Sequence, residues 1–232
     1  LEAGFGEPQV YVKIAPTPSK LPSYDLDDNL QIEKNKVLFR VKGVGAYYIT
    51  DGNSIIVEPE KNSKKDAIRL FLLGSAFGAL LYQRGFTPIH GSSVSLGDKC
   101  YIFTGDSGAG KSTLAAAMIT RGYKLISDDI SCVHIDDEKN VMVIPAYPQQ
   151  KLWEDSAKML GYDCEKLSRV VDDENKYCIG SLETFDSAPK VLDTIFYITK
   201  SDQNTSDLIQ INELRGAAKL EVILNNLYRP MF

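Results

Sequence analysis

The chain has 232 residues and a net charge of −5, with 44% hydrophobic and 25% charged residues. This composition is typical of an ordinary globular protein with one or two domains, and it excludes a global basic field that would attract nucleic acid or anionic lipid. The chain contains no C-x-x-C pair and no visible secretory signal. We therefore expect free thiols, a cytoplasmic location and no nucleic-acid or membrane partner; the thiols are Cys100, Cys132, Cys164 and Cys178.

Residues 9 to 58 are rich in short runs of β-branched and aromatic residues. These runs predict strands, and the DGN at 51–53 predicts a tight hairpin turn. The predicted strands are QVYVKI, LQIE, KVLFRVKG, GAYYIT and SIIVEP. The sequence thus predicts a β-rich N-terminal module over residues 1–62, which either binds the substrate or covers the sheet of the domain that follows over residues 63–232.

The stretch AIRLFLLGSAFGALLYQRGF, residues 67 to 86, is the longest apolar segment. The uncharged part between Arg69 and Arg84 is shorter than the roughly 20 residues that a membrane crossing requires. We predict a buried helix that leads the larger domain, with Gly74 and Gly78 allowing close packing.

Strands and helices alternate after residue 88. IHGSSVSL and KCYIFTG predict two strands around a GD turn, followed by a helix from about Lys111 to Arg121 with Gly122 just beyond it. YKLIS predicts a strand that lies beside KCYIFTG in a central sheet. The later predicted elements are a hairpin of SCVHID and NVMVIPA, a helix across KLWEDSAKMLG, a strand KVLDTIFYITK and a final helix in LRGAAKLEVILNNLY.

A glycine-rich loop joins the second of these strands to the helix. It fits G-x-x-x-x-G-K-[ST] at every fixed position, a pattern whose backbone N–H groups wrap a phosphate at the positive end of a helix dipole. Lys111 would reach the β- and γ-phosphates, Ser112 would take a place on Mg²⁺, and Thr113 would pack against or support the loop. The motif consists of Gly105, Asp106, Ser107, Gly108, Ala109, Gly110, Lys111 and Ser112.

Two adjacent acids, Asp128 and Asp129, follow the strand YKLIS, and His90 precedes the loop. One carboxylate would hold Mg²⁺ and the other would accept the proton of an attacking hydroxyl, although either could instead cap the following turn. Two acids at this point favour phosphoryl transfer to an alcohol over simple hydrolysis. His90 would hydrogen-bond a phosphoryl oxygen or orient an aspartate.

The combination IHGSSV…GDSGAGKS…RGYKLISDD resembles the catalytic core of HPr kinase/phosphorylase and its shorter relatives, over about residues 86 to 135. The resemblance implies an α/β fold with a P-loop kinase core like the C-terminal domain of HPr kinase. It implies transfer of the γ-phosphate of ATP, with Mg²⁺, to a serine hydroxyl of a small protein or peptide. It also implies that Lys111 binds phosphate, Ser112 binds Mg²⁺ and Asp129 accepts the proton. His90 and Asp128 would be their partners, Asp128 as an acid linked to the metal.

Two departures from this family pattern stand out. Thr113 replaces an acid that usually follows the loop serine, and KLWED at 151–155 replaces an E-x-R-G-x-G segment, so Lys151 or Glu154 would substitute. PQQKLW and LYRP resemble short relatives encoded with ribosomally made peptides, some of which phosphorylate lasso-peptide precursors. We therefore favour a precursor peptide as acceptor. HPr itself, a nucleotide-dependent sensor without catalysis and a small-molecule kinase remain as alternatives.

Other positions have weaker expectations. Arg169, Lys176 and Arg229 are candidates for contacts with phosphate or peptide, although a solvated surface is favoured for each of them. Trp153, the single tryptophan, is expected as a core anchor, with a wall of the peptide groove as the alternative. The sequence leaves a homo-oligomer open.

Overall fold

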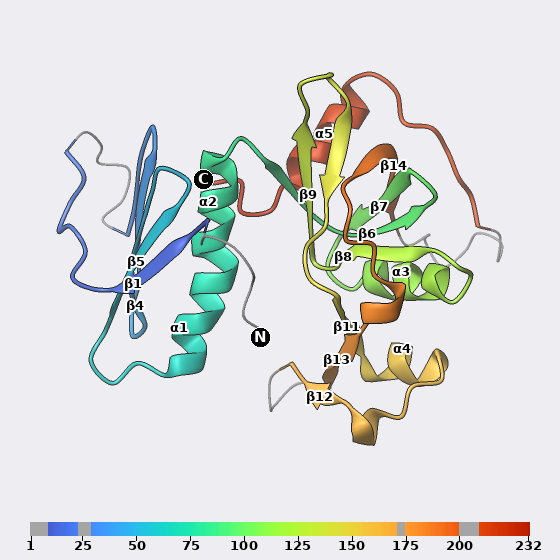
Figure 1. The fold of residues 1–232 in the computed structure, drawn as a ribbon, viewed down its shortest axis with the longest axis horizontal. Helices are drawn as coiled ribbons and strands as arrows, with labels where there is room; N and C mark the ends of the chain where they lie inside the picture. Colours follow the sequence, from blue (N-terminus) through green and yellow to red (C-terminus); the bar gives the residue numbers. More distant parts are fainter. Residues whose placement is uncertain (1–8, 23–28, 171–174, 200–208) are drawn as a thin grey trace. The chain divides into compact units, whose positions relative to one another are not determined.

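The computed structural model describes residues 9–22, 29–170, 175–199 and 209–232. Its contacts divide the chain into two compact units, one of Leu1–Phe86 with Arg229–Phe232 and the other of Thr87–Tyr228 (Figure 1). The sequence placed the division between residues 62 and 63. The structure places it later because the apolar helical segment packs into the core of the N-terminal unit rather than leading the C-terminal one.

The N-terminal unit contains a five-stranded sheet in the order β1-β5-β4-β3-β2, in which β1 is parallel to β5 and the other pairs are antiparallel. All the strands predicted for this region are confirmed, and so is the hairpin turn, where Asp51 and Gly52 have positive φ. The strands are β1 (Tyr11–Ile14), β2 (Leu30–Glu33), β3 (Lys36–Val41), β4 (Gly45–Thr50) and β5 (Ser54–Pro59).

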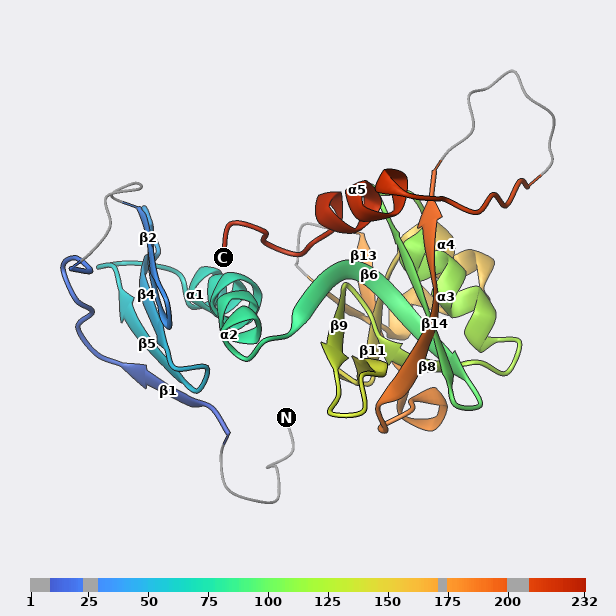
Figure 2. The same ribbon diagram turned by 90° about the horizontal axis from the view of Figure 1, so that it is seen from above.

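A helical segment covers one face of this sheet (Figures 1 and 2). It consists of α1 (Lys65–Phe71), the π-helical turn η1 (Leu72–Ala76) and α2 (Phe77–Gln83). Its small side chains at Ala76 and Ala79 bring it close to alternate residues of the sheet, as expected for strands with one buried face. The core that results contains Val37, Phe39, Tyr47, Ile49, Ile55, Val57, Ala76, Ala79 and Leu80. Within the described ranges, no helix has the length and apolarity that a membrane crossing would need.

The C-terminal unit is built on a mixed six-stranded sheet in the order β7-β14-β10-β9-β6-β8. Because β6 also pairs with β7, the pairings close a ring of β6, β7, β14, β10 and β9, with β8 attached to β6. The strands are β6 (Thr87–Leu96), β7 (Lys99–Gly105), β8 (Lys124–Ser127), β9 (Ile130–Ile135), β10 (Val141–Ile144) and β14 (Lys190–Ile198).

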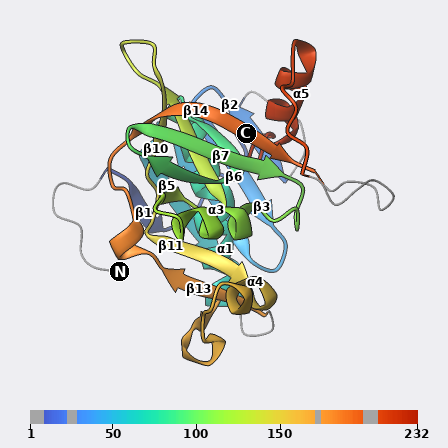
Figure 3. The same cartoon turned by 90° about the vertical axis from the view of Figure 1, so that its right-hand side faces the viewer.

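Helix α3 (Lys111–Ile119) lies between this sheet and a smaller one (Figure 3). One side of α3 packs through Ala115 on Val94 and Phe103 of the large sheet. The other side packs through Ala116 on the smaller, antiparallel sheet and on α4 (Glu154–Met159). The smaller sheet, in the order β11-β13-β12, contains β11 (Gln149–Trp153), β12 (Ser168–Arg169) and β13 (Lys176–Gly180). Two short 3₁₀ turns, η2 (Cys164–Lys166) and η3 (Leu182–Thr184), and a final helix, α5 (Ala217–Asn225), complete the unit.

The structure corrects four expectations about this unit. Strand β8 pairs with β6 rather than with β7, because the long β6 lies between them. The segment KLW is a strand rather than the start of a helix, and α5 begins only after Gly216, which has φ of 56°. Trp153 is 51% exposed and is no core anchor, because it lies on the face of β11 opposite buried Leu152.

Candidate active site

The loop Gly105–Gly110 connects the end of β7 to the start of α3. Two of its glycines are structurally required. A Cβ atom at Gly105 would lie 2.5 Å from the backbone oxygen of Ile198, and Gly110 has φ of 98° directly before the helix. The loop therefore turns sharply while its exposed residues Asp106, Ser107 and Gly108 carry little bulk at the helix N-terminus. Such a loop suits a phosphate group.

Lys111 is 8% exposed and folds back onto this loop. Its Nζ donates hydrogen bonds to the backbone oxygens of Gly105 (2.9 Å) and Asp106 (3.0 Å). Burial lowers the pKa of Lys111, while the charges of Asp129, Asp106 and Asp128 oppose this change. Within the described residues its ammonium group forms no salt bridge, so it can offer its charge to an anion bound in the loop.

Both oxygens of the Asp128 carboxylate have hydrogen-bond donors. Ser92 Oγ donates to Oδ1 at 2.6 Å, and the backbone N–H of Lys151 donates to Oδ2 at 2.7 Å. Ser92 Oγ also lies 3.4 Å from Ser112 Oγ, so one hydroxyl connects the loop serine to the first aspartate. Burial, followed by the charge of Asp129, raises the pKa of Asp128.

The backbone at Asp129 is in an unusual conformation. Asp129 has φ of 68°, and the N–H of Ile130 donates to the Asp128 carbonyl at 2.9 Å, which makes Asp129 the centre of a three-residue turn. The carbonyl of Asp129 accepts a hydrogen bond from Gly91 N at 3.1 Å and another from the side chain of His90. Strained turns of this kind are held by their surroundings and are concentrated at functional sites.

The Asp129 carboxylate lies between two lysines. Oδ2 is 2.6 Å from Nζ of Lys151, and Oδ1 is 4.0 Å from Nζ of Lys176; the side chain is 30% exposed. Burial opposes ionisation of Asp129, but the charge and hydrogen bond of Lys151, together with Lys176 and His90, lower its pKa overall. The carboxylate is therefore ionised and accessible from solvent.

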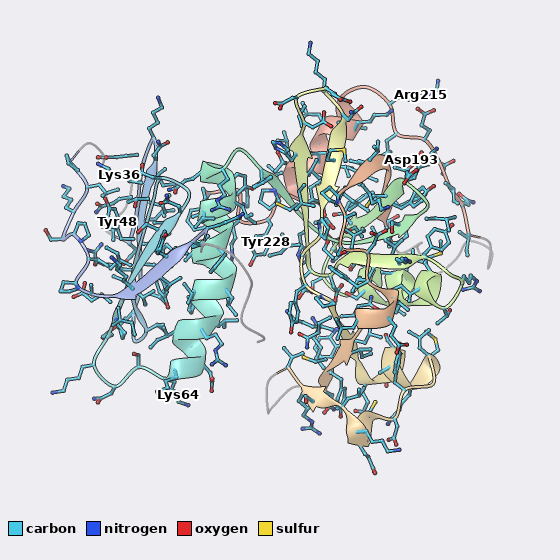
Figure 4. The ribbon with its side chains drawn as sticks, in the orientation of Figure 1. Lys36, Tyr48, Lys64, Asp193, Arg215 and Tyr228 are labelled. Carbon is cyan, nitrogen blue, oxygen red and sulfur yellow. The ribbon has the colours of Figure 1, made fainter. Side chains whose placement is uncertain are left out.

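His90 is held by the segment that follows α5. Its backbone N–H donates to the carbonyl of Asn226 at 2.8 Å, and the centroid of its ring lies 6.4 Å from that of Tyr228, which is labelled in Figure 4. Burial, followed by the charge of Lys111, lowers the pKa of His90, and Asp129 partly opposes this. The imidazole is therefore neutral near pH 7.

The structure brings His90, Lys111, Ser112, Asp128 and Asp129 together. It leaves the other sequence candidates in different places. Thr113 Oγ1 lies 2.8 Å from Ser156 Oγ, Glu154 pairs with Lys158, and Arg229 belongs to the N-terminal unit. Arg169 lies over the ring of Tyr177, while Lys151 and Lys176 lie at Asp129.

Ser92 was missed by sequence reasoning. The available signal was its position two residues after His90 on a strand, which places both side chains on the same face.

Side chains suited to a metal are few: no group of three or more His, Cys, Asp or Glu residues with metal-binding geometry occurs in the part of the chain that the structure describes. Any metal here would depend on hydroxyl and carboxylate oxygens together.

Comparison with known proteins places a family resemblance on this same region. The family model described as HPr Serine kinase C-terminal domain matches residues 85–154. The HPr kinase/phosphorylase of Latilactobacillus sakei subsp. sakei (strain 23K) is 41% identical over 54 residues, which is 23% of this chain and 17% of that protein. These similarities support an HPr kinase-like family for the segment that carries the loop, His90 and both aspartates.

A solved structure, the HPr(Ser) kinase/phosphatase from Coxiella burnetii, aligns with a TM-score of 0.35 and 14% identity. The alignment covers 52% of this chain and 70% of that one. At this level of similarity the alignment carries no argument about the fold.

Proposed function

We propose that the protein is an ATP-dependent serine kinase with a P-loop core, which transfers the γ-phosphate to a serine hydroxyl of a small protein or peptide. One relationship carries the proposal: an ionised and accessible carboxylate, Asp129, faces the same site as the buried ammonium of Lys111. A nucleotide hydrolase needs no such second carboxylate, whereas transfer to an alcohol needs a proton acceptor.

The residues of the site fit Mg²⁺ and a triphosphate. Hydroxyl and carboxylate oxygens are the ligands that Mg²⁺ prefers, and Ser112 and Asp128 bring one of each to the start of α3. Lys111 and the backbone N–H groups of the loop would bind the phosphates. When bound, the metal supplies charge neutralisation for the phosphate oxygens.

Asp129 and its partners would perform the proton transfer. The lowered pKa of Asp129 keeps its carboxylate ionised, so it can accept the proton of a serine hydroxyl that enters from the exposed side. The neutral imidazole of His90 holds the strained turn by its bond to the Asp129 carbonyl. Lys151 and Lys176 neutralise the charge of Asp129 while no phosphate is near.

The acceptor we favour is the precursor of a ribosomally made peptide of the lasso type, on the resemblance of PQQKLW and LYRP to the short relatives. HPr is the second candidate acceptor, because the curated relative is named an HPr kinase/phosphorylase. The missing family segment argues against phosphorolysis and against recognition of HPr; for the second candidate, Lys151, which contacts Asp129, would have to substitute for that segment.

Mass spectrometry of candidate precursor peptides and of HPr, after incubation with ATP and Mg²⁺, tests the proposal. We expect the addition of one phosphoryl group to a serine of one acceptor, and none with Lys111→Ala. If the phosphorylated acceptor loses its phosphoryl group and pyrophosphate forms when inorganic phosphate is added, the protein is a bifunctional kinase/phosphorylase. Nucleotide binding without phosphorylation of any acceptor would contradict the kinase and favour a sensor.

A further inference from the structure

Ser92 connects two parts of the candidate site that are far apart in the sequence. It lies on β6, is 1% exposed and reaches both the loop serine and the first aspartate. The register of β6 explains its position: Ser92 pairs with Phe103 on β7, while Ser93, the next residue, pairs with Ser127 at the end of β8. Strand β6 thus lies between the strand that leads into the loop and the strand that leads into the aspartates.

The direction of the hydrogen bonds follows from their partners. Asp128 is ionised when it binds a metal and can only accept, so the Ser92 hydroxyl donates its single hydrogen to Oδ1 at 2.6 Å. The oxygen of Ser92 lies 3.4 Å from that of Ser112, and the Ser112 side chain also hydrogen-bonds Asp128. Both serines therefore bind the first aspartate, and Ser92 lies beside the two expected metal ligands.

The orientation of Asp128 is fixed at both oxygens. Ser92 holds Oδ1, and the backbone N–H of Lys151 holds Oδ2 at 2.7 Å. The Lys151 donor is a backbone N–H, so it remains when the side chain of Lys151 is replaced by that of any residue except proline. The Ser92 hydroxyl contacts both Asp128 and Ser112, which also hydrogen-bond each other, so it holds one side of this pair in place.

We propose that Ser92 is a positioning residue that aligns the Ser112 hydroxyl with the Asp128 carboxylate and so sets the affinity of the site for a divalent cation. The inference rests on the proposed function, in which Ser112 and Asp128 hold Mg²⁺. Groups that orient metal ligands in this way typically change metal affinity by about 10- to 100-fold when they are removed.

The chain offers a matched control on the same strand. Ser95 is 2% exposed, and its hydroxyl donates to the carboxylate of Asp186 at 3.0 Å. Ser92→Ala and Ser95→Ala therefore each remove a buried serine hydroxyl bonded to an aspartate. Only Ser92→Ala removes one beside the glycine-rich loop.

The experiment measures binding of a fluorescent ATP analogue to the full chain as Mg²⁺ is titrated, and again in EDTA. For Ser92→Ala we expect the half-saturating Mg²⁺ concentration to rise about tenfold or more, with unchanged binding in EDTA. For Ser95→Ala we expect the wild-type Mg²⁺ dependence. If Ser92→Ala fails to fold, Ser92→Cys, which is only slightly larger but donates weakly, should show the same rise.

Two outcomes would overturn the inference. One is a half-saturating Mg²⁺ concentration that stays at the wild-type value in the folded Ser92 variant. The other is an equal loss of binding with and without Mg²⁺, which would indicate a purely structural role. A wild-type protein that binds the nucleotide with no dependence on Mg²⁺ would instead contradict the metal assignment of the proposed function itself.

Discussion

Nζ of Lys151 lies 2.6 Å from Oδ2 of Asp129, and the backbone N–H of the same lysine holds Oδ2 of Asp128 at 2.7 Å. One residue of β11 therefore contacts both aspartates, by its side chain and by its backbone. Because the two contacts are chemically separate, a side-chain substitution of Lys151 changes the environment of Asp129 while the bond to Asp128 remains.

Replacement of Lys151 by methionine should shift the pH dependence of phosphoryl transfer. Asp129 has a lowered pKa in the folded protein, so its charged form is kept as the pH falls until that pKa is reached. Without the Lys151 charge the pKa of Asp129 rises, and activity should be lost at a higher pH on the acidic side. The acidic limb of the kcat/KM profile measures this shift.

Lys158→Met is the control for this experiment. Lys158 also lies 2.6 Å from a carboxylate, that of Glu154, but its side chain is 61% exposed and lies on α4. Its substitution should leave the pH profile unchanged. An acidic limb that stays in place in Lys151→Met, or moves to lower pH, would contradict the role of Lys151.

Asp129→Asn should separate transfer from nucleotide binding. Asparagine tolerates positive φ and keeps the size of the side chain, so the strained turn should persist. The loss of the proton acceptor should lower kcat by roughly 10²- to 10⁴-fold, while ATP binding remains. Lys111→Ala, by contrast, should lose both, as measured by calorimetry and by acceptor phosphorylation. Near-normal transfer by Asp129→Asn would refute its assignment as the base.

Much of this organisation follows from local sequence patterns. Short runs of β-branched and aromatic residues predicted the N-terminal strands, and the glycine-rich loop between a strand and a helix predicted the turn before Lys111. Both signals are short-range, because strand propensity and glycine conformations act within a few residues. The proximity of Asp128 and Ser112 was expected, but from a pairing of β8 with β7 that proved wrong, and their roles in binding and catalysis stay predictions.

The rest depends on contacts between distant segments. The separation of β7 from β8 follows from how far β6 extends, which no local pattern determines. The helical segment of residues 65–83 belongs to the N-terminal unit because its small residues fit the face of that sheet. Lys176 reaches Asp129 only because β13 pairs with β11, and β13 itself was not predicted.

The four cysteines should differ in their reactivity toward iodoacetamide under native conditions. Burial raises the pKa of both Cys100 and Cys132 to about 12, so almost no thiolate is present near neutral pH. Cys164 and Cys178 are only partly buried and should be alkylated first. Peptide mass spectrometry after short exposure measures the order, and early modification of Cys100 would contradict the closed sheet around it.

Gly91→Ala should destabilise the C-terminal unit by about 1–3 kcal/mol. A Cβ atom at Gly91 would lie 2.6 Å from the backbone oxygen of Phe103, and the backbone of a paired strand cannot yield as a side chain can. Trp153, the single tryptophan, lies in this unit, so its fluorescence in a urea titration measures the loss. Gly180→Ala is the control, because no atom lies within 4 Å of its Cβ position, and it should be neutral or slightly stabilising.

Since Gly91 separates His90 from Ser92, Gly91→Ala should also weaken Mg²⁺-dependent nucleotide binding, whereas Gly180→Ala should leave it unchanged. A Gly91→Ala protein as stable as the wild type would show that β6 and β7 do not approach as closely as described.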